Sequence, residues 1–417
     1  MTVAEILADE SSATGAHPRI VAALIARTGD WSLAEDCTQE AIARALDRWP
    51  VTGVPDNPGA WLMTVARNLA IDVLRRRGTT RALIGELAAV TSLVTTGPSV
   101  DDLTIDGEIP DDRLRLLFTC CHPALSLDDR VALTLRTVCG VPTGDIARAL
   151  VVSESTMTRR ITRAKTKIAE AEIPYVVPSG PELAPRRSGV LSVVYLLFTG
   201  GHDPAGDPPF AWEALRLARL LADLQPDEEA NALLALILLT QARHATRRDA
   251  EDIPVGLEDQ DRSLWDRSMI AEGLDLVGGI GTTGPFAIQA RLAAEHARAD
   301  RWESTDWPAI VALYDVLYEL RPDPVVALNR AIATGHGVSP DVGLALLAEV
   351  CADGQLTGHH SLVAAEAHLA ALRGDLRRAE LQFRHAMTLT DDQPTRTALH
   401  RRAERLVELI ADGGRHV

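Results

Sequence analysis

The sequence is poor in the features that mark sheets, membranes and secretion. Aromatic residues make up only 4% of the 417 residues, and no stretch sustains the apolar–polar alternation of a half-buried strand. No apolar run reaches the roughly 20 residues that span a bilayer. Residues 1–10 are acidic and lack the basic start and apolar centre of a signal peptide. We therefore expect a cytoplasmic, all-α protein without a membrane partner.

Metal and catalytic signatures are scarce as well. The cysteines are odd in number and lack CxxC spacing, which argues against a disulfide framework. They are Cys37, Cys120, Cys121, Cys139 and Cys351. Adjacent cysteines followed by His122 suggest zinc, but such neighbours chelate one ion poorly and no second Cys/His pair has zinc-finger spacing. The sequence contains no P-loop, GxSxG or HExxH motif. We expect no metal, no cofactor and no enzymatic activity.

Charge and proline divide the chain into segments. The 42 basic and 58 acidic residues give a net charge of -16, which argues against a protein that coats nucleic acid along its whole surface. Residues 82–112 carry seven acidic residues and no Lys or Arg, as a flexible acidic linker does. Four prolines interrupt residues 173–187. The predicted domains are thus residues 1–81 and 113–172, two small helical blocks, and residues 188–417, a long helical run.

The long helical run shows signs of a repeat. Helix breaks at Leu224-Gln225-Pro226-Asp227 and Leu320-Arg321-Pro322-Asp323 look alike. Ala379, Phe383 and Ala386 have the small-large-small spacing of a tetratricopeptide (TPR) second helix. Stacked helical hairpins bury faces that no single hairpin buries alone. The pattern predicts a TPR-like array.

Residues 143–168 have the pattern of a helix-turn-helix. Thr143 is expected to cap a short helix and Ser153 a second one. Met157, Ile161, Ala164 and Ile168 form an apolar stripe on the second helix, opposite Arg and hydroxyl side chains. Such a helix reads a major groove, although a basic helix alone is also explained by a solvated surface. The predicted DNA-binding residues are Ser155, Thr156, Arg159, Arg160, Thr162, Arg163 and Lys167.

A second basic helix is expected over residues 58–77. Leu62, Val65, Leu69 and Val73 form its predicted buried stripe. The candidate DNA-binding residues on it are Trp61, Arg67, Asn68, Arg75, Arg76 and Arg77. The arginine run suits a phosphate backbone or the capping of a helix C-terminus, and Trp61 suits either base stacking or a core.

An amphipathic helix is also predicted over residues 31–49. Asp36, Gln39 and Glu40 fall on its outer face. Taken alone, these three residues are explained by an ordinary surface helix.

The order of these segments resembles the extracytoplasmic-function (ECF) group of sigma-70 factors. Residues 31–41 (WSLAEDCTQEA) are similar to region 2.2, residues 61–77 to regions 2.3 and 2.4, and the helix-turn-helix to region 4.2. Residues 116–125 (LLFTCCHPAL), 259–265 and 306–310 resemble the ECF subgroup with a C-terminal TPR-like extension.

The resemblance implies an RNA polymerase sigma factor without enzymatic activity, in which Asp36, Gln39 and Glu40 face the polymerase clamp. It further implies that the helix over residues 58–77 melts and reads the -10 element and that the helix-turn-helix reads the -35 element. The expected partners are core RNA polymerase, through its β and β′ subunits, promoter DNA, and an unknown protein or ligand on the C-terminal extension. The alternative is a TPR-bearing helix-turn-helix regulator that does not act as a sigma subunit, which gives residues 31–77 no role.

Overall fold

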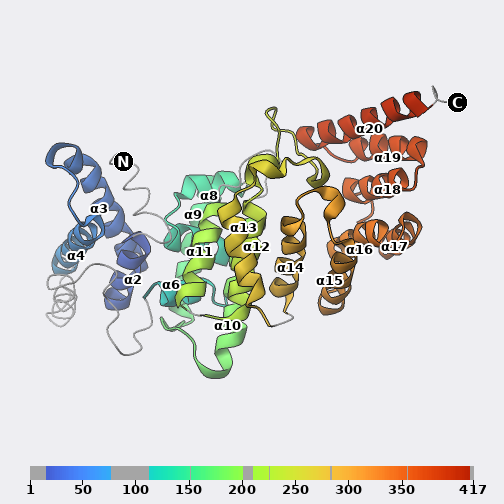
Figure 1. Ribbon diagram of the computed structural model, residues 1–417. Coiled ribbons are helices and arrows are strands. Elements are labelled where there is room, and N and C mark those ends of the chain that lie inside the picture. The colour runs from blue at the N-terminus through green and yellow to red at the C-terminus, as the bar shows by residue number, and fades with distance from the viewer. Residues whose placement is uncertain are drawn as a thin grey trace. The chain divides into compact units, whose positions relative to one another are not determined.

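The computed structural model describes residues 16–76, 112–150, 152–200, 210–224, 226–281, 284–354 and 356–413. In these ranges the regular structure is helical, and extended pairing is limited to one isolated bridge between Arg248 and Pro254. The expected all-α class is confirmed (Figure 1). The chain forms two compact units. The first comprises Met1–Gly201 and Pro209–Gln225, and the second comprises His202–Pro208 and Pro226–Val417.

The first unit begins with a three-helix bundle made of α2 (Ala16–Thr28), α3 (Trp31–Thr52) and α4 (Pro58–Arg76). Asp30 caps α3 by accepting a hydrogen bond from the amide of Leu33 at 2.9 Å. At the other end, Gly53 adopts φ 82°, a left-handed conformation that suits glycine. Residues 77–111, which hold nearly all of the predicted acidic linker and Arg77, lie outside the described residues.

The predicted buried stripe of α4 is wrong by about one residue. The fully buried positions are Leu62, Ala66, Ala70 and Leu74, whereas Val65, Leu69 and Val73 are half-buried flanks. Small residues also dominate the buried face of α3, namely Ala34, Ala41 and Ala45. Alanine allows close approach of helix backbones. The buried faces of α3 and α4 therefore include small side chains that a search for large apolar residues passes over.

The second helical block comprises α6 (Asp112–Cys120), α7 (Leu127–Leu133), a π-helical turn η2 (Thr134–Val138), α8 (Thr143–Ala149) and α9 (Glu154–Glu170). The helix-turn-helix is formed as predicted, and Ser153 caps α9 by accepting a hydrogen bond from the amide of Thr156. Thr143 is not the cap of α8, because Pro142 occupies that position and Thr143 is the first helical residue. The predicted apolar stripe of α9 is buried throughout.

The proline-rich break is shorter than predicted. After the short 3-10 turn η3 (Gly180–Glu182), helix α10 (Leu183–Gly200) begins inside the predicted linker. Pro185 lies in its first turn, where the missing amide proton has no intrahelical partner to lose. Helix α10 packs against α6 and α7, and α11 (Ala211–Leu224) packs against α10. The first unit therefore extends beyond residue 188, where we placed the start of the C-terminal domain.

The second unit is a stack of nine described helices, each packed against its neighbours along the chain. They are α12 (Glu228–Gln241), α13 (Arg267–Gly278), α14 (Pro285–Arg298), α15 (Trp307–Leu320), α16 (Pro324–Gly337), α17 (Pro340–Asp353), α18 (His360–Leu372), α19 (Leu376–Thr388) and α20 (Gln393–Gly413). Asp227 and Asp323, which end the two similar breaks, cap α12 and α16. The predicted positions Ala379, Phe383 and Ala386 are buried on α19. This packing is that of a helical solenoid.

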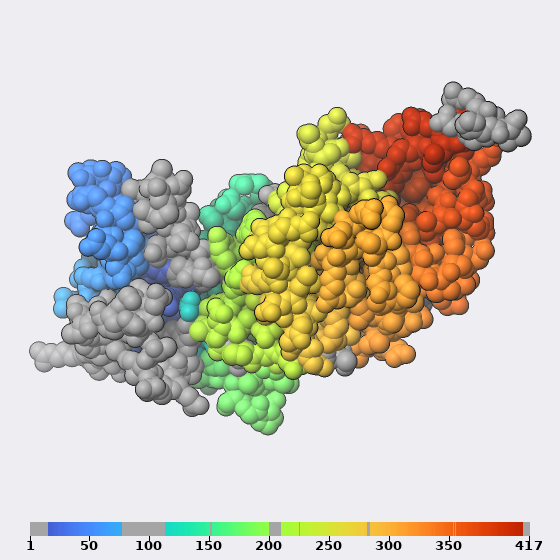
Figure 2. Space-filling view, viewed as in Figure 1, coloured from blue at the N-terminus to red at the C-terminus, as the bar shows by residue number. Residues whose placement is uncertain are grey.

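The last helix of this unit contacts the segment that follows its first helix. Three arginines of α20 pair with four acidic residues of residues 249–259, which include the 3-10 turn η5 (Leu257–Asp259). We call this set the charge clasp. It consists of Arg401 with Asp249 and Glu251, Arg402 with Glu258, and Arg405 with Asp259. In Figure 2 the yellow-green surface of the segment meets the red surface of α20.

Candidate polymerase and promoter interfaces

The predicted clamp-binding residues lie on the outer side of α3. Asp36 and Glu40 are exposed and Gln39 is half-buried, while Leu33 and Cys37 turn inward. Glu40 pairs with Arg44 one turn later, with 2.9 Å between Oε1 and Nε. The structure therefore brings the three predicted side chains together on one accessible acidic surface.

The predicted -10 residues of α4 are spread over an exposed face and the last turn. Asn68, Arg75 and Arg76 are exposed. Arg67 is half-buried, and its Nη2 donates a hydrogen bond to Oδ1 of Asn68 at 3.1 Å. A basic last turn next to an amide-bearing face suits contact with a nucleic-acid backbone.

Trp61 lies partly in the core and partly at the surface. Its ring is half-buried and meets Trp49 edge to face, with 5.4 Å between the ring centroids. Trp49 is 2% exposed and forms the core part of the pair. Trp49 lies at the end of a long amphipathic pattern in the sequence, and that position gave no signal that Trp49 would pack against Trp61.

The predicted reading face of α9 is open to solvent. Ser155, Arg159, Thr162 and Lys167 are exposed, and Thr156 is half-buried beside its cap Ser153. Nε of Arg159 donates to the backbone oxygen of Ser155 at 3.3 Å. The side chains that such a helix presents to a major groove are thus accessible along its outer face.

Two acidic residues of α7 hold the remaining arginines of α9. Arg160 pairs with Asp128 at 3.3 Å, and Arg163 pairs with Asp129 at 2.9 Å. Burial alone raises the pKa of Asp129, but hydrogen bonds from Ser126 and Arg163 and the charge of Arg163 outweigh it and lower the pKa. The Arg163 side chain is nonetheless 68% exposed. Sequence reasoning missed this pairing because the partners lie about thirty residues upstream on a separate helix.

Comparison with known families matches the two helical blocks of the first unit to sigma-70 regions. The sequence matches the family Sigma-70 region 2 over residues 14–80 and the family Sigma-70, region 4 over residues 115–168. Residues 186–279 match a family of unknown function, DUF6596. The ECF RNA polymerase sigma factor SigL of Mycobacterium tuberculosis is 32% identical over 32% of this chain and 71% of its own length.

The chain belongs to the ECF group of the sigma-70 family. The probable ECF RNA polymerase sigma factor SigI of Mycobacterium tuberculosis is 33% identical over 39% of this chain and 55% of its own length. An uncharacterized protein of Rhizobium meliloti is 42% identical over 80% of each chain, so its similarity extends into the C-terminal unit. No solved structure matches.

Sigma factors bind core RNA polymerase and promoter DNA and are a non-catalytic class of transcription factor. In this ECF sigma factor, region 2 corresponds to the bundle α2–α4, and region 4 to the block α6–α9. The long helical C-terminal part is compatible with the subgroup that carries an extension. None of the helices in the described ranges combines the length and apolar character that a bilayer crossing needs.

The cysteine pair next to His122 lies at the C-terminal end of α6. Cys120 and Cys121 are buried, and burial raises the pKa of the Cys121 thiol to about 11. Nδ1 of His122 accepts a hydrogen bond from the amide of Ala124 and so stabilises the turn after α6. Among the described residues, no group of three or more His, Cys, Asp or Glu side chains is arranged to hold a metal ion.

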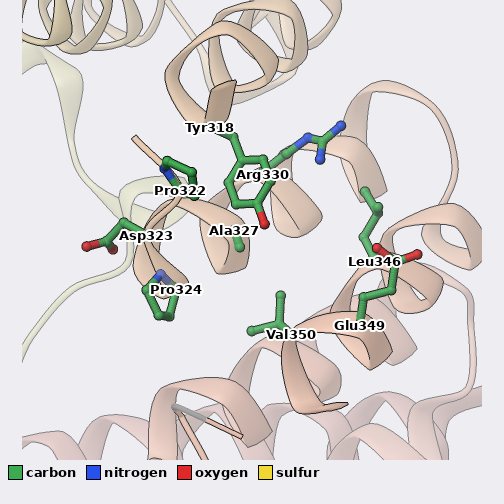
Figure 3. A pocket seen from close by; sticks show the side chains of 9 residues that line it. All are labelled: Tyr318, Pro322, Asp323, Pro324, Ala327, Arg330, Leu346, Glu349 and Val350. Carbon is green, nitrogen blue, oxygen red and sulfur yellow. The ribbon is translucent and has the colours of Figure 1, made fainter. Parts of the chain in front are cut away.

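The second unit contains a cavity of about 260 Å³ between α15, α16 and α17. Figure 3 shows Tyr318 and Arg330 side by side at this cavity, with Glu349 across from them. The guanidinium of Arg330 lies 5.4 Å from the Tyr318 ring centroid and pairs with Asp315 at 2.6 Å. Asp323 caps α16. Arg330 therefore links α16 to α15, and Asp323 stabilises the start of α16.

Proposed function

We propose that the chain directs promoter-specific initiation, with region 2 melting and reading the -10 element and region 4 reading the -35 element. The observation that carries this proposal is the exposed cationic face of α9 in a chain of net charge -16. An apolar stripe docks α9 on α7 and α8, and the opposite face offers Arg159 and Thr162 to solvent. Arginine recognises guanine edges through paired hydrogen bonds.

The α7 acids favour base reading over simple charge neutralisation. Asp129 holds one nitrogen of Arg163, so the side chain loses less rotamer freedom when it meets DNA. Among the residues that the structure describes, no acidic side chain pairs with Arg159, which instead bonds the backbone of its own helix. We infer that Arg163 is the pre-oriented contact and Arg159 the adaptable one.

For the -10 element, we propose that Asn68, Arg75 and Arg76 follow the phosphate backbone. Trp61, which packs against Trp49, offers the exposed part of its ring for stacking with an unpaired base. We further propose that the C-terminal unit regulates this activity by binding a protein or a ligand, since a solenoid offers an extended surface for partners.

The test is run-off transcription with the full chain and core polymerase. The change Arg163→Ala is expected to weaken use of the cognate -35 element by about 1–3 kcal/mol, roughly 5- to 150-fold, and to relax preference at one base pair. The matched control is Arg377→Ala, which removes an exposed arginine of α19 in the second unit. An equal loss on every template sequence would show that Arg163 contacts phosphate only.

Core binding is tested separately. The double change Asp36→Ala and Gln39→Ala is expected to abolish co-purification with core polymerase, whereas Asp47→Ala, an exposed acid on the same helix, leaves it intact. If the wild-type chain bound its promoter tightly without core polymerase and never co-purified with it, the alternative of a helix-turn-helix regulator would replace the sigma proposal.

A further inference from the structure

Two arginines that follow α12 have no partner for their charge in the described part of the chain. Arg243 and Arg247 flank the 3-10 turn η4 (His244–Thr246), and both side chains are half-buried. Among the described residues, neither pairs with an acidic side chain and neither guanidinium donates a hydrogen bond. The next arginine along the chain, Arg248, pairs with Asp252 at 3.2 Å. Because a charge withdrawn from water is costly unless it is paired, Arg243 and Arg247 are unfavourable in the protein alone.

A third guanidinium lies near Arg243. The ring centroid of Trp265 lies 5.9 Å from the guanidinium carbon of Arg243 and 4.7 Å from that of Arg262. Arg262 is 8% exposed, and its Nη1 donates to the backbone oxygens of His296 and Ala299, both at 2.6 Å. Its Nη2 is buried and has no hydrogen-bond partner among the described residues. A buried donor of this kind favours any ligand whose oxygen comes within its reach.

The charges that act on Arg243 and Arg247 are positive. Burial, and then the charges of Arg247 and Arg262, lower the pKa of Arg243 to about 10. Burial and the charge of Arg248 lower the pKa of Arg247. His296 lies in the same field, since burial and the charges of Arg243 and Arg262 lower its pKa to about 4 and keep its ring neutral. This part of a chain of net charge -16 is therefore cationic.

Hydrogen bonds hold the cluster in place. Thr246 donates both its amide and its Oγ1 to the backbone oxygen of Arg243, at 3.0 Å each. Nε1 of Trp265 donates to the same Oγ1 at 3.0 Å. Trp265 thus links the turn that carries Arg243 and Arg247 to the segment that carries Arg262. Because the backbone is fixed in this way, less conformational freedom is lost when a ligand binds.

The unpaired charges select the class of ligand. Arg262 is partly offset by Asp300 and Glu303, whose charges oppose the effect of burial on its pKa. Arg243 and Arg247 add two positive charges, and no acid is among the groups that shift their pKa values. A dianion matches these two charges, and guanidinium groups bind oxyanions through paired hydrogen bonds. A phosphate group, which carries about -1.5 to -2 charges at pH 7, meets both requirements.

We propose that the second unit binds a phosphate group at Arg243, Arg247 and Arg262, with Nη2 of Arg262 as one of the donors. The group belongs to inorganic phosphate or to a small phosphorylated molecule. Because Arg262 is anchored on carbonyls at the end of α14, the bound group joins the turn after α12 to the end of α14 and stiffens this part of the solenoid. Its biological role rests on the proposed function, in which the C-terminal unit regulates the sigma factor by binding a protein or a ligand.

Binding is measured on the full chain by isothermal titration calorimetry with inorganic phosphate, at an ionic strength held constant with sodium chloride. The wild-type chain is expected to bind phosphate saturably. Arg243→Gln and Arg247→Gln are each expected to weaken binding about tenfold or more, because hydrogen bonds to a charged group are lost. Arg247→Lys keeps the charge without the planar fork and is expected to lose less. The matched control Arg298→Gln, which removes an exposed arginine of α14 that pairs with Glu295, leaves the affinity unchanged.

Urea unfolding of the second unit distinguishes a binding site from a structural role. A ligand that binds only the folded state stabilises it, so phosphate at about 100 times its dissociation constant raises the ratio of folded to unfolded wild-type chain about 100-fold. Without phosphate, Arg247→Gln is expected to leave this ratio unchanged or higher, because it removes a positive charge from a cationic cluster. With phosphate, the variant gains about tenfold or less. Equal gains in the wild-type chain and both Gln variants, or no saturable binding of phosphate, would overturn the site.

Competition identifies the source of the phosphate group. Displacement of inorganic phosphate by AMP would support a phosphorylated molecule as the ligand, whereas binding of phosphate without competition by AMP would support free phosphate. The sigma function is tested separately, because run-off transcription by the wild-type chain is carried out without phosphate. A failed phosphate titration therefore leaves the sigma function standing, and a failed transcription assay leaves the phosphate site standing.

Discussion

We expect the position at which the C-terminal extension is truncated to decide whether region 4 folds. Helix α10 buries six large apolar side chains inside the first unit. They are Val190, Leu191, Val193, Val194, Leu197 and Phe198. Burying each contributes roughly 1.5–3 kcal/mol, so the six contribute roughly 9–18 kcal/mol. If α11 covers half of this surface, the other half is buried against α6 and α7. The free energy that this half contributes is still a large part of the roughly 5–15 kcal/mol that stabilises a whole domain.

A chain ended after Pro178 is therefore expected to lose cooperative unfolding of region 4. It also loses Arg186, whose Nη2 donates to the backbone oxygen of Phe118 at 3.0 Å. A chain ended after Gln225 keeps α10 and α11 and is expected to unfold cooperatively. Urea unfolding followed by circular dichroism compares the two. Equal midpoints for region 4 in both fragments would refute the view that α10 completes its core.

Three further outcomes are expected. Phe383→Ala removes a ring that is 4% exposed and should lower the unfolding free energy of the second unit by about 3–5 kcal/mol, measured by calorimetry. Burial lowers the pKa of His296, His336 and His368 to about 4. The folded unit thus binds fewer protons than the unfolded chain below about pH 6.5. The unfolding free energy should therefore fall as pH drops below that value, by up to about 1.4 kcal/mol per pH unit for each histidine. Urea unfolding at pH 7 and at pH 5 measures this loss. Arg402→Gln should cost under about 1 kcal/mol, an effect abolished by high salt in the same assay.

Local patterns identified the helices well. Ser153 and the apolar stripe that begins at Met157 together specify α9. Both signals are local, because a cap and a 3.6-residue period depend only on residues within one or two helical turns. Asp227 and Asp323 mark helix starts for the same reason. The start of α10 was missed because Pro185 reads as a helix breaker, although its position in a first turn costs nothing.

The partners of charged residues were much harder to predict. Nothing near Glu35 in the sequence distinguishes it from its exposed neighbour Asp36, yet one is buried and the other is on the surface. The difference arises from Thr137 of η2 and Lys165 of α9, which lie more than 100 residues away in sequence and contact Glu35 only in the folded first unit. A helix wheel gives the direction of a side chain but not what another segment places in front of it.

The charge clasp also joins charged residues whose pairing the sequence pattern does not predict. In an open solenoid each repeat contacts only its neighbours, so its two ends vary independently. Here Arg402 of the last helix reaches Glu258, and it lies so close to Gly256 that a Cβ at that position would collide with its guanidinium. Half-exposed ion pairs of this kind contribute little stability each. Their effect is geometric, because they fix the distance between the first and last helices. A partner that changes the curvature of the stack must therefore break the clasp or be limited by it.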